Sequence, residues 1–501
     1  MQTTPWTKRL MAWVAPIARL ARLDPWQRQS LLAAGLATSL LIAAPAGADD
    51  GRGSNGGSKW AASWATSIQS AYVLPTTPQG AAVPGFDPQP DLSIPLPNAT
   101  TTGAVNQTFR MIIKPDLWGR TIRVRFSNVF GTKPVTFSQA AVALQGYQAN
   151  LVPGTSVTLT FNGNRRVTIP AGQQLFSDPV DLPFVPAANP HGLAGRNLAV
   201  SFAVDGASGP LSHHASAFTT SYISAADSGD KVREEDDTAF PYSTTSFFFV
   251  SQLDVLAPKD TLVVVAFGDS ITDGTFSTLN GNDRWSNVMS RQLHKRLGHR
   301  VSVVNAGIGG NAVVALRTGQ PATQRVGRDV IGLSGVNLVV WMEGINDLGG
   351  GLVTPEPVIA GYRQVVAALR QARIGVIGAT LTSSYVPGGQ VPANSPLAAV
   401  SPTLAAQYGS AQTDAYRRTL NRFILTGGLF DATADFAAMT TDPATGTLYR
   451  PFVPNSEGSA GDYLHPNRAG YQAMGVTAAH AVFGWLRGRH AAAAGVREAA
   501  N

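Results

Sequence analysis

The sequence contains no cysteine, which excludes disulfide bonds, thiol catalysis, a lipidated cysteine and thiolate metal sites together. Charge is also scarce, because Asp, Glu, Lys and Arg make up only 14% of the residues while hydrophobic residues make up 44%. A disordered chain would carry fewer apolar groups and more net charge, so this composition indicates a globular protein. A length of 501 residues exceeds one ordinary core, and we expect two folded units plus processing segments.

The sequence also lacks a basic stripe interleaved with aromatic residues, although its formal charge is +7. Most of that excess lies in the first 48 residues, where five basic side chains oppose a single acidic one. In the rest of the chain the two signs are interspersed. We therefore expect no nucleic-acid partner.

The N-terminal segment has no apolar run long enough to span a membrane. Its run of about 14–16 residues is shorter than the roughly 20 that a span needs. A basic stretch precedes it and Ala46-Gly47-Ala48 follows it, as at a signal-peptide cleavage site. We predict a signal peptide at 1–48, a flexible Gly/Ser-rich linker at 49–58, and a secreted or periplasmic protein with no stable membrane partner after cleavage. An uncleaved inner-membrane anchor is the alternative, because the basic region is unusually long.

Residues 59–257 have the alternation and the turn residues of β structure. The segment 121–126 alternates polar and apolar residues, so a strand there would bury Ile122, Val124 and Phe126 on one face. Similar runs, separated by Gly, Pro and Asn turns, occur at 107–113, 135–144, 156–162, 197–204 and 246–256. Short strands at this spacing predict an all-β sandwich, jelly-roll-like, as an accessory domain over 59–257.

The pattern changes at about residue 261 to alternating strands and helices. Strand 262–267 is continuously apolar, as expected of a strand covered on both faces. Further strands are predicted at 301–304, 336–342 and 374–379, and helices at 285–297 and near 355–372, 411–425 and 467–487. This order predicts an α/β fold with a doubly wound parallel sheet over 258–490, followed by a C-terminal tail at 491–501. Ligands of such sheets bind beyond the carboxyl ends of the strands.

The first polar motif, Gly268-Asp269-Ser270, directly follows the strand at 262–267. A hydroxyl nucleophile needs exposure at a strand end and a nearby helix N-terminus that favours developing negative charge. Ser270 is therefore a candidate nucleophile. The alternative is that the motif only makes a turn and an N-cap, with Ser270 satisfying backbone amides.

The second motif, NAGIGGN, follows the strand at 301–304 and is rich in bare backbone. It matches the dinucleotide pattern G-x-G-x-x-A at Gly307, Gly309 and Ala312, with Asp329 downstream. However, it follows the second strand of its unit, and such matches are common. We favour a loop that offers amide hydrogens to an oxyanion, with Gly310 as the donor.

The third motif places Asn346 after the strand at 336–342, where its amide could donate a hydrogen bond to a tetrahedral oxyanion. A turn-forming Asn-Asp pair is the alternative. The fourth motif places Asp462 three residues before His465. This offset can bring the carboxylate to Nδ1 and leave Nε2 facing Ser270, although a helix-entry cap and a surface histidine would give the same sequence.

In this order, and all at strand ends, the four motifs resemble the SGNH (GDSL) hydrolase family, named for a Ser, a Gly, an Asn and a His in four blocks. The matching segments are GDSITDG, NAGIGGN, EGIND and DYLHPNRAGY, and the resemblance covers about 260–487. It implies a flavodoxin-like sheet, with Ser270 as the nucleophile and His465 as a base oriented by Asp462. It also implies an oxyanion hole made by the amides of Ser270 and Gly310 and by the side chain of Asn346.

The preceding region resembles the leading β domain of bacterial secreted esterases similar to acetylxylan esterases and arylesterases. The resemblance is carried by WAASWATS at 60–67, NQTFRMII at 106–113 and IRVRFSNVFGTKP at 122–134. This region also contains the pair His213-His214, which could suggest a metal site. No third ligand candidate accompanies the pair, so we expect it in a surface loop.

These features predict a secreted serine carboxylic-ester hydrolase that works through an acyl-enzyme and needs no metal or organic cofactor. Its expected partners are short-chain acyl esters, including small-molecule, aryl and acetylated carbohydrate esters. Loops at 384–410 and 440–461 are expected to shape the acyl and alcohol pockets. The first loop is apolar enough for a lipid, which makes a GDSL lipase or lysophospholipase the runner-up. A non-catalytic exported glycan-binding module is the alternative from another class.

Overall fold

The computed structural model describes residues 57–71, 89–349, 353–389, 402–454 and 463–498. Residues 57–501 make up one compact unit. The predicted signal peptide at 1–48, nearly all of the linker and Asp462 lie outside the described residues. Among the helices of the described ranges, none is long and apolar enough to cross a membrane.

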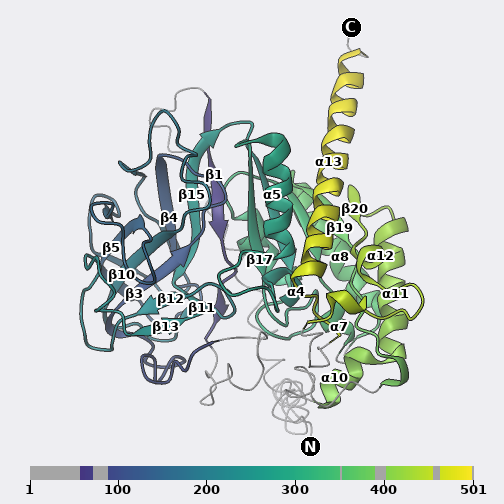
Figure 1. The fold of residues 1–501 in the computed structure, drawn as a ribbon, viewed down its shortest axis with the longest axis horizontal. Coiled ribbons are helices and arrows are strands. Elements are labelled where there is room, and N and C mark those ends of the chain that lie inside the picture. The colour runs from purple at the N-terminus through teal and green to yellow at the C-terminus, as the bar shows by residue number, and fades with distance from the viewer. Residues whose placement is uncertain (1–56, 72–88, 350–352, 390–401, 455–462, 499–501) are drawn as a thin grey trace, which may run out of the picture. The chain divides into compact units, whose positions relative to one another are not determined.

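The first part of the described chain is made of antiparallel strands (Figure 1). Their bounds are β1 Ser58–Ala65, β2 Gln69–Ser70, β3 Val105–Ile113, β4 Thr121–Ser127, β5 Val135–Leu144, β6 Val157–Leu159, β7 Val167–Ile169, β8 Gln174–Phe176, β9 Val180–Asp181, β10 Leu198–Ala207, β11 Ser212–His214, β12 Ser221–Ile223, β13 Tyr242–Thr244, β14 Phe247–Phe248 and β15 Val250–Pro258. One sheet has the order β1-β15-β4-β8 with β9 beside β4, and another has the order β13-β12-β3-β10-β5-β6 with β7 beside β5. A small sheet has the order β14-β11-β2.

Phenylalanine rings join the two larger sheets into the predicted sandwich. Ile122, Val124 and Phe126 of β4 are buried, as their alternation predicted. The ring of Phe126 lies 5.5 Å from that of Phe202 in β10 and 5.4 Å from that of Phe137 in β5. Residues from facing sheets thus share one apolar core.

The second part of the chain contains a parallel sheet with helices on both faces. Its strands are β16 Leu262–Gly268, β17 Val301–Gly307, β18 Val336–Met342, β19 Gly375–Ala379 and β20 Ala432–Ala434. They lie in the order β17-β16-β18-β19-β20, and every pairing is parallel. Numbered along the chain this is the order 2-1-3-4-5 of flavodoxin-like sheets, so the predicted fold class is confirmed.

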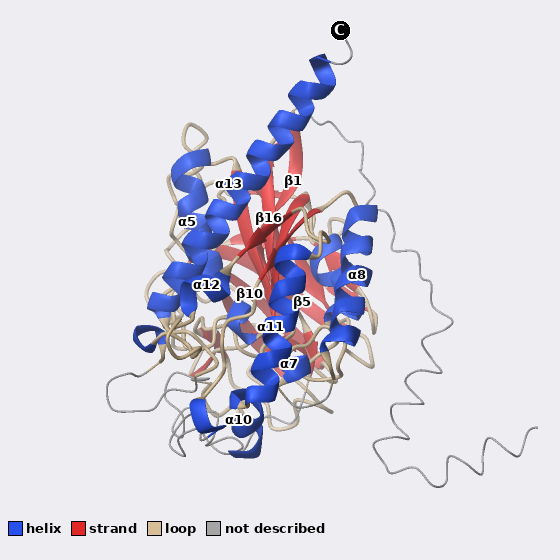
Figure 2. Cartoon of the chain, turned by 90° about the vertical axis from the view of Figure 1, so that its right-hand side faces the viewer, coloured by secondary structure: helices blue, strands red, loops and turns tan. Residues whose placement is uncertain are grey.

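The helices are α4 Ser270–Asp273, α5 Trp285–Leu297, α6 Ala322–Val326, α7 Ile345–Leu348, α8 Pro355–Gln371, α10 Pro402–Gly409, α11 Ala411–Thr426, α12 Phe436–Thr440 and α13 Arg468–Glu498. Shorter helical segments cover 327–331, 387–389 and 450–452. Figure 2 shows α5, α12 and α13 on one side of the sheet and α8 and α11 on the other. Helix α5 begins and ends as predicted. Its apolar face is buried, because Trp285, Met289 and Leu293 recur every four residues.

The structure differs from the sequence-based expectation mainly in short elements and in one helix end. Strand β20 and helices α10 and α12 were not predicted, because each is too short to show a clear period. Helix α13 runs to Glu498 rather than ending near 487. Residues 491–494 are four alanines, the best helix formers, which favours this continuation.

The β-rich region and the α/β region are joined by hydrogen bonds along β1 and β4. The amide of Ala62 donates to the Ser334 carbonyl at 2.9 Å, and the Ser302 hydroxyl donates to the Ala62 carbonyl at 2.7 Å. Buried Arg125 also donates to the Gly332 carbonyl at 2.9 Å. The β-rich region therefore packs directly against the sheet that carries the polar motifs.

Replacing Phe202 by alanine should destabilise the sandwich by about 3–5 kcal/mol, because it would open a cavity in the phenylalanine cluster. Chemical denaturation followed by circular dichroism measures the change. Leu256→Ala in β15 is the matched control, since that side chain is 42% exposed and its loss should change stability by less than about 0.5 kcal/mol. Equal effects of the two substitutions would contradict the assigned core.

Candidate active site

Three neighbouring strands of the parallel sheet end level with one another. Gly268 of β16 pairs with Gly307 of β17 on one side and with Met342 of β18 on the other. The motifs that follow these strands therefore meet at one edge of the sheet. The approach is close, because a Cβ on Gly307 would lie 2.3 Å from the backbone nitrogen of Asp273 in α4.

Ser270 is the first residue of α4 and faces His465. The N-cap is Asp269, whose Oδ1 accepts a hydrogen bond from the Ile271 amide at 3.0 Å. The cap that we considered for Ser270 is thus supplied by its neighbour. The Ser270 Oγ lies 2.8 Å from His465 Nε2, which is a proton-transfer distance, and both residues are buried.

The segment before α13 supplies His465, and Leu464 beside it is buried in a small apolar cluster with Ile345, Ala405 and Tyr408. Asp462 lies outside the described residues, so its assignment as the partner of His465 stays a prediction. The ring of Phe276 lies 6.0 Å from the His465 ring and packs beside the pair.

Gly310 lies in the loop that follows β17, in a conformation that favours glycine. Its φ is +72°, and a Cβ would lie 2.6 Å from the Thr318 hydroxyl. The amide of the preceding Gly309 donates to Asp273 Oδ2 at 3.0 Å. This bond attaches the glycine loop to the helix that carries Ser270.

Asn346, in α7, is bound to the same loop. Its Nδ2 donates to the Asn311 carbonyl at 2.7 Å, which uses one of the two amide hydrogens. Its Oδ1 accepts a hydrogen bond from the Tyr408 hydroxyl at 2.5 Å. The side-chain amide is therefore fixed from both ends, and Tyr408 is a functional candidate that the sequence analysis did not identify.

The aspartate that follows Asn346 holds the segment beyond the glycine loop. The two carboxylate oxygens of Asp347 accept hydrogen bonds from the amides of Val313 at 2.8 Å and of Val314 and Ala315 at 3.0 Å. Burial raises the pKa of Asp347, although these bonds favour the carboxylate. The pair Asn346-Asp347 is thus more than a turn former.

Arg325, in α6, joins the ends of the central strands through hydrogen bonds. Its guanidinium is fully buried and donates to the carbonyls of Gly268 and Ala306 at 2.8 Å each and to Asn311 Oδ1 at 2.7 Å. It also binds Glu343 at 3.2 Å. Burial raises the pKa of Glu343 to about 7, although the guanidinium opposes this effect.

Asp329, considered above as the acidic residue of a dinucleotide pattern, is engaged by arginines. One oxygen lies 2.6 Å from Arg328 Nε, and the other lies 3.4 Å from Arg325 Nη1. These ion pairs give the carboxylate a structural role in the helical segment that follows α6.

The prediction that His213 and His214 lie in a surface loop is wrong. Both are buried in strand β11, which pairs with β14 and β2. His214 Nε2 lies 3.0 Å from Asp273 Oδ1, and its Nδ1 lies 2.9 Å from the Ser67 carbonyl oxygen. Burial alone lowers the pKa of His214, but the Asp273 carboxylate more than offsets this and the net pKa is raised. Burial lowers the pKa of His213 to about 4, so the pKa values of the two neighbouring rings are shifted in opposite directions.

The arrangement defines an α/β protein with a hydroxyl–imidazole pair and fixed amide groups at the carboxyl edge of its sheet. Residues 266–473 match the family described as GDSL-like Lipase/Acylhydrolase family. The match confirms the resemblance for this part of the chain, and the family is one of hydrolases. The β-rich region lies outside the match.

Three of the solved structures that are similar to this chain are a lipase and two esterases. A GDSL-like lipase from Bacteroides thetaiotaomicron is 18% identical, with 45% of this chain and 89% of that chain covered and a TM-score of 0.31. An acetyl xylan esterase is 20% identical, with 44% of this chain and 100% of that chain covered and a TM-score of 0.30. A carbohydrate acetylesterase family member from Sinorhizobium meliloti is 17% identical, with 45% of this chain and 99% of that chain covered and a TM-score of 0.32. No curated protein matches the sequence. Likenesses this low say nothing about the substrate of this chain.

Replacing His214 by glutamine should destabilise the protein more at pH 6 than at pH 9. The raised pKa means that the charged pair stabilises the fold at pH values below about 6.5, the usual pKa of histidine, and that this contribution is lost as the pH rises through the higher folded value. The expected loss at pH 6 is about 1–3 kcal/mol. Thermal unfolding at both pH values measures it, with the exposed His480→Gln as control. A loss that is the same at both pH values would refute the charged pair.

Proposed function

We propose that the chain is a secreted serine carboxylic-ester hydrolase that acts through an acyl-enzyme on short-chain acyl esters, including aryl esters and acetylated carbohydrate. The observation that carries the proposal is the 2.8 Å contact between Ser270 Oγ and His465 Nε2 at the carboxyl edge of the sheet. Two bulky side chains, Phe276 beside His465 and Tyr408 on Asn346, favour a short acyl group over a long one.

In the proposed mechanism, His465 takes the Ser270 proton as the hydroxyl oxygen bonds to the ester carbonyl carbon. The carbonyl oxygen becomes an oxyanion, which the amides of Ser270 and Gly310 and the Asn346 side chain stabilise. Collapse of this intermediate breaks the ester bond, and His465 protonates the departing alcohol. Water, activated by the same ring, then releases the acid from Ser270. Asp462 is proposed to hold the ring in the correct tautomer.

A series of nitrophenyl esters of increasing chain length, run beside an acetylated-xylan release assay, tests the substrate. The proposal predicts the highest kcat/KM for acetate to butyrate esters. A maximum at eight carbons or longer would favour a lipase, and no hydrolysis of any ester would favour a non-catalytic glycan-binding module.

Ser270→Ala should abolish covalent labelling by a fluorophosphonate probe and lower kcat to background, because the attacking oxygen is lost. Mass spectrometry of the labelled wild-type protein locates the modified residue. A label on a different serine would overturn the assignment. Unchanged circular dichroism of the variant shows that folding is not the cause.

Asn346→Ala should lower kcat about 10²–10³-fold, the usual effect of removing one oxyanion donor. Tyr408→Phe should lower kcat by about 3- to 10-fold with little change in KM, because the amide loses one orienting hydrogen bond worth about 0.5–1.5 kcal/mol. In the double variant, Tyr408→Phe should add nothing to Asn346→Ala, since the tyrosine acts through the amide. Additive losses would assign Tyr408 a separate role.

A further inference from the structure

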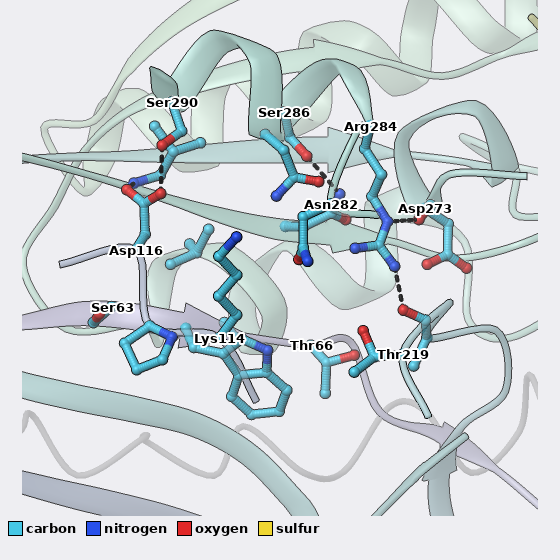
Figure 3. Close-up of a pocket in the computed structure, with 18 of the residues that line it drawn as sticks. Ser63, Thr66, Lys114, Asp116, Thr219, Asp273, Asn282, Arg284, Ser286 and Ser290 are labelled. Carbon is cyan, nitrogen blue, oxygen red and sulfur yellow. Dashed lines mark hydrogen bonds between the residues drawn. The ribbon is translucent and has the colours of Figure 1, made fainter. Parts of the chain in front are cut away.

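A cavity of about 280 Å³ lies between β1, the end of β3 and helix α5, and neither Ser270 nor His465 lines it (Figure 3). The residues that line it include the buried pair His214 and Asp273, which connects the cavity to helix α4. Ligand pockets for drug-sized molecules span roughly 300–1,000 Å³, so this space suits one small ring rather than a chain of them.

Lys114, just beyond β3, extends its ammonium group into this cavity (Figure 3). Within the described ranges its Nζ makes no hydrogen bond or ion pair. Burial lowers the pKa of Lys114, and the positive charge of Arg291 lowers it further, whereas Asp116 opposes both effects. The cavity therefore holds a partly desolvated cation that lacks a direct counter-ion.

The carboxylate of Asp116 does not serve as the direct counter-ion of Lys114, because its oxygens already accept other hydrogen bonds. They accept hydrogen bonds from the Ser290 hydroxyl, from His294 at 3.1 Å and from the Val303 amide at 2.7 Å. The arrangement thus leaves room for an external anion beside Lys114.

Neutral polar groups line the same space. The Oδ1 of Asn287, in α5, is buried and has no hydrogen-bond partner among the described residues. A hydroxyl group both donates and accepts, so it would satisfy this amide in either orientation. Thr66 and Thr219 also line the cavity, and Figure 3 shows their side chains beside it.

An aromatic side chain completes the lining. Trp64 of β1 is half-buried, and Phe247 packs against it edge to face at a ring distance of 5.0 Å. A fixed aromatic ring beside hydroxyl-binding groups suits the apolar C–H face of a sugar ring, while the cation suits a carboxylate on the same ring.

We propose that this cavity binds a pyranose sugar that carries a carboxylate, a hexuronic-acid residue, with its carboxylate on Lys114 Nζ. The residue is taken either as the free acid or as the terminal unit of an oligosaccharide. The cavity belongs to the folded protein whatever ester the hydrolytic site cleaves, so this inference does not depend on the proposed function.

Isothermal titration of the full chain with glucuronate, glucose and inorganic phosphate tests the inference. Glucuronate should bind saturably and at least tenfold more tightly than either of the others. If glucose bound as tightly as glucuronate, Lys114 would not recognise the carboxylate. If phosphate bound as tightly as glucuronate, the cavity would not recognise the sugar ring. Undetectable glucuronate binding at 10 mM would overturn the proposal.

Lys114→Gln should weaken glucuronate binding at least tenfold and leave glucose binding unchanged. Because this cation has no direct partner, the variant should keep its melting temperature and its activity on nitrophenyl acetate. Lys259→Gln removes the same charge from an exposed position outside the cavity and should bind as the wild type does. Unchanged glucuronate binding in Lys114→Gln would refute the site.

An oligosaccharide with a terminal glucuronic acid distinguishes a cavity for glycan ends from a cavity for the free acid. Tighter binding than the free acid assigns the cavity to glycan ends, and weaker binding assigns it to the free acid. A crystal structure with the bound sugar should show its carboxylate within hydrogen-bond distance of Lys114 Nζ. Density elsewhere on the surface would overturn the assignment.

Discussion

The buried guanidinium of Arg325 is the interaction on which the geometry of the site depends. It binds the carbonyl at the end of β16, the carbonyl near the end of β17 and the side chain of Asn311, and it pairs with Glu343 after β18. These are the segments that carry the serine, the glycine loop and the asparagine. A buried arginine is tolerated only when its donors find acceptors, and here those acceptors are the parts that must be held in register.

The β-rich region contributes to the same geometry rather than standing apart from it. His214 comes from a strand of that region, yet it binds Asp273 three residues after the candidate nucleophile. The other oxygen of Asp273 holds the Gly309 amide. One carboxylate thus connects a histidine of the β-rich region, helix α4 and the glycine loop, so a change in how the two regions pack should reach the Ser270 environment directly.

Most of the fold and the pairing of Ser270 with His465 could be anticipated because they follow from local signals. Strand period, strand ends and short motifs are properties of neighbouring residues, and parallel strands bring their carboxyl ends together without further information. Ser270 and His465 are 195 positions apart, but each lies in a recognisable motif, whereas the errors concern residues whose distant partners belong to no motif that links them. His214 was placed at the surface because its partner lies 59 positions away, and Tyr408 was not identified because Asn346 lies 62 positions away.

The requirement that a buried cation find an acceptor distinguishes the cations that stabilise the fold from the cation in the cavity. Arg325 and Arg110 are buried and bind several acceptors each, and the half-buried Lys59 still finds the Gly335 carbonyl at 3.2 Å. Such groups serve the fold, which satisfies them. Lys114 is comparably buried but has no such acceptor among the described residues, and it points into a cavity with a buried, unpartnered amide oxygen. Among the described residues the fold supplies acceptors to Arg325, Arg110 and Lys59 but none to Lys114 Nζ, which leaves that acceptor to be supplied from outside the chain.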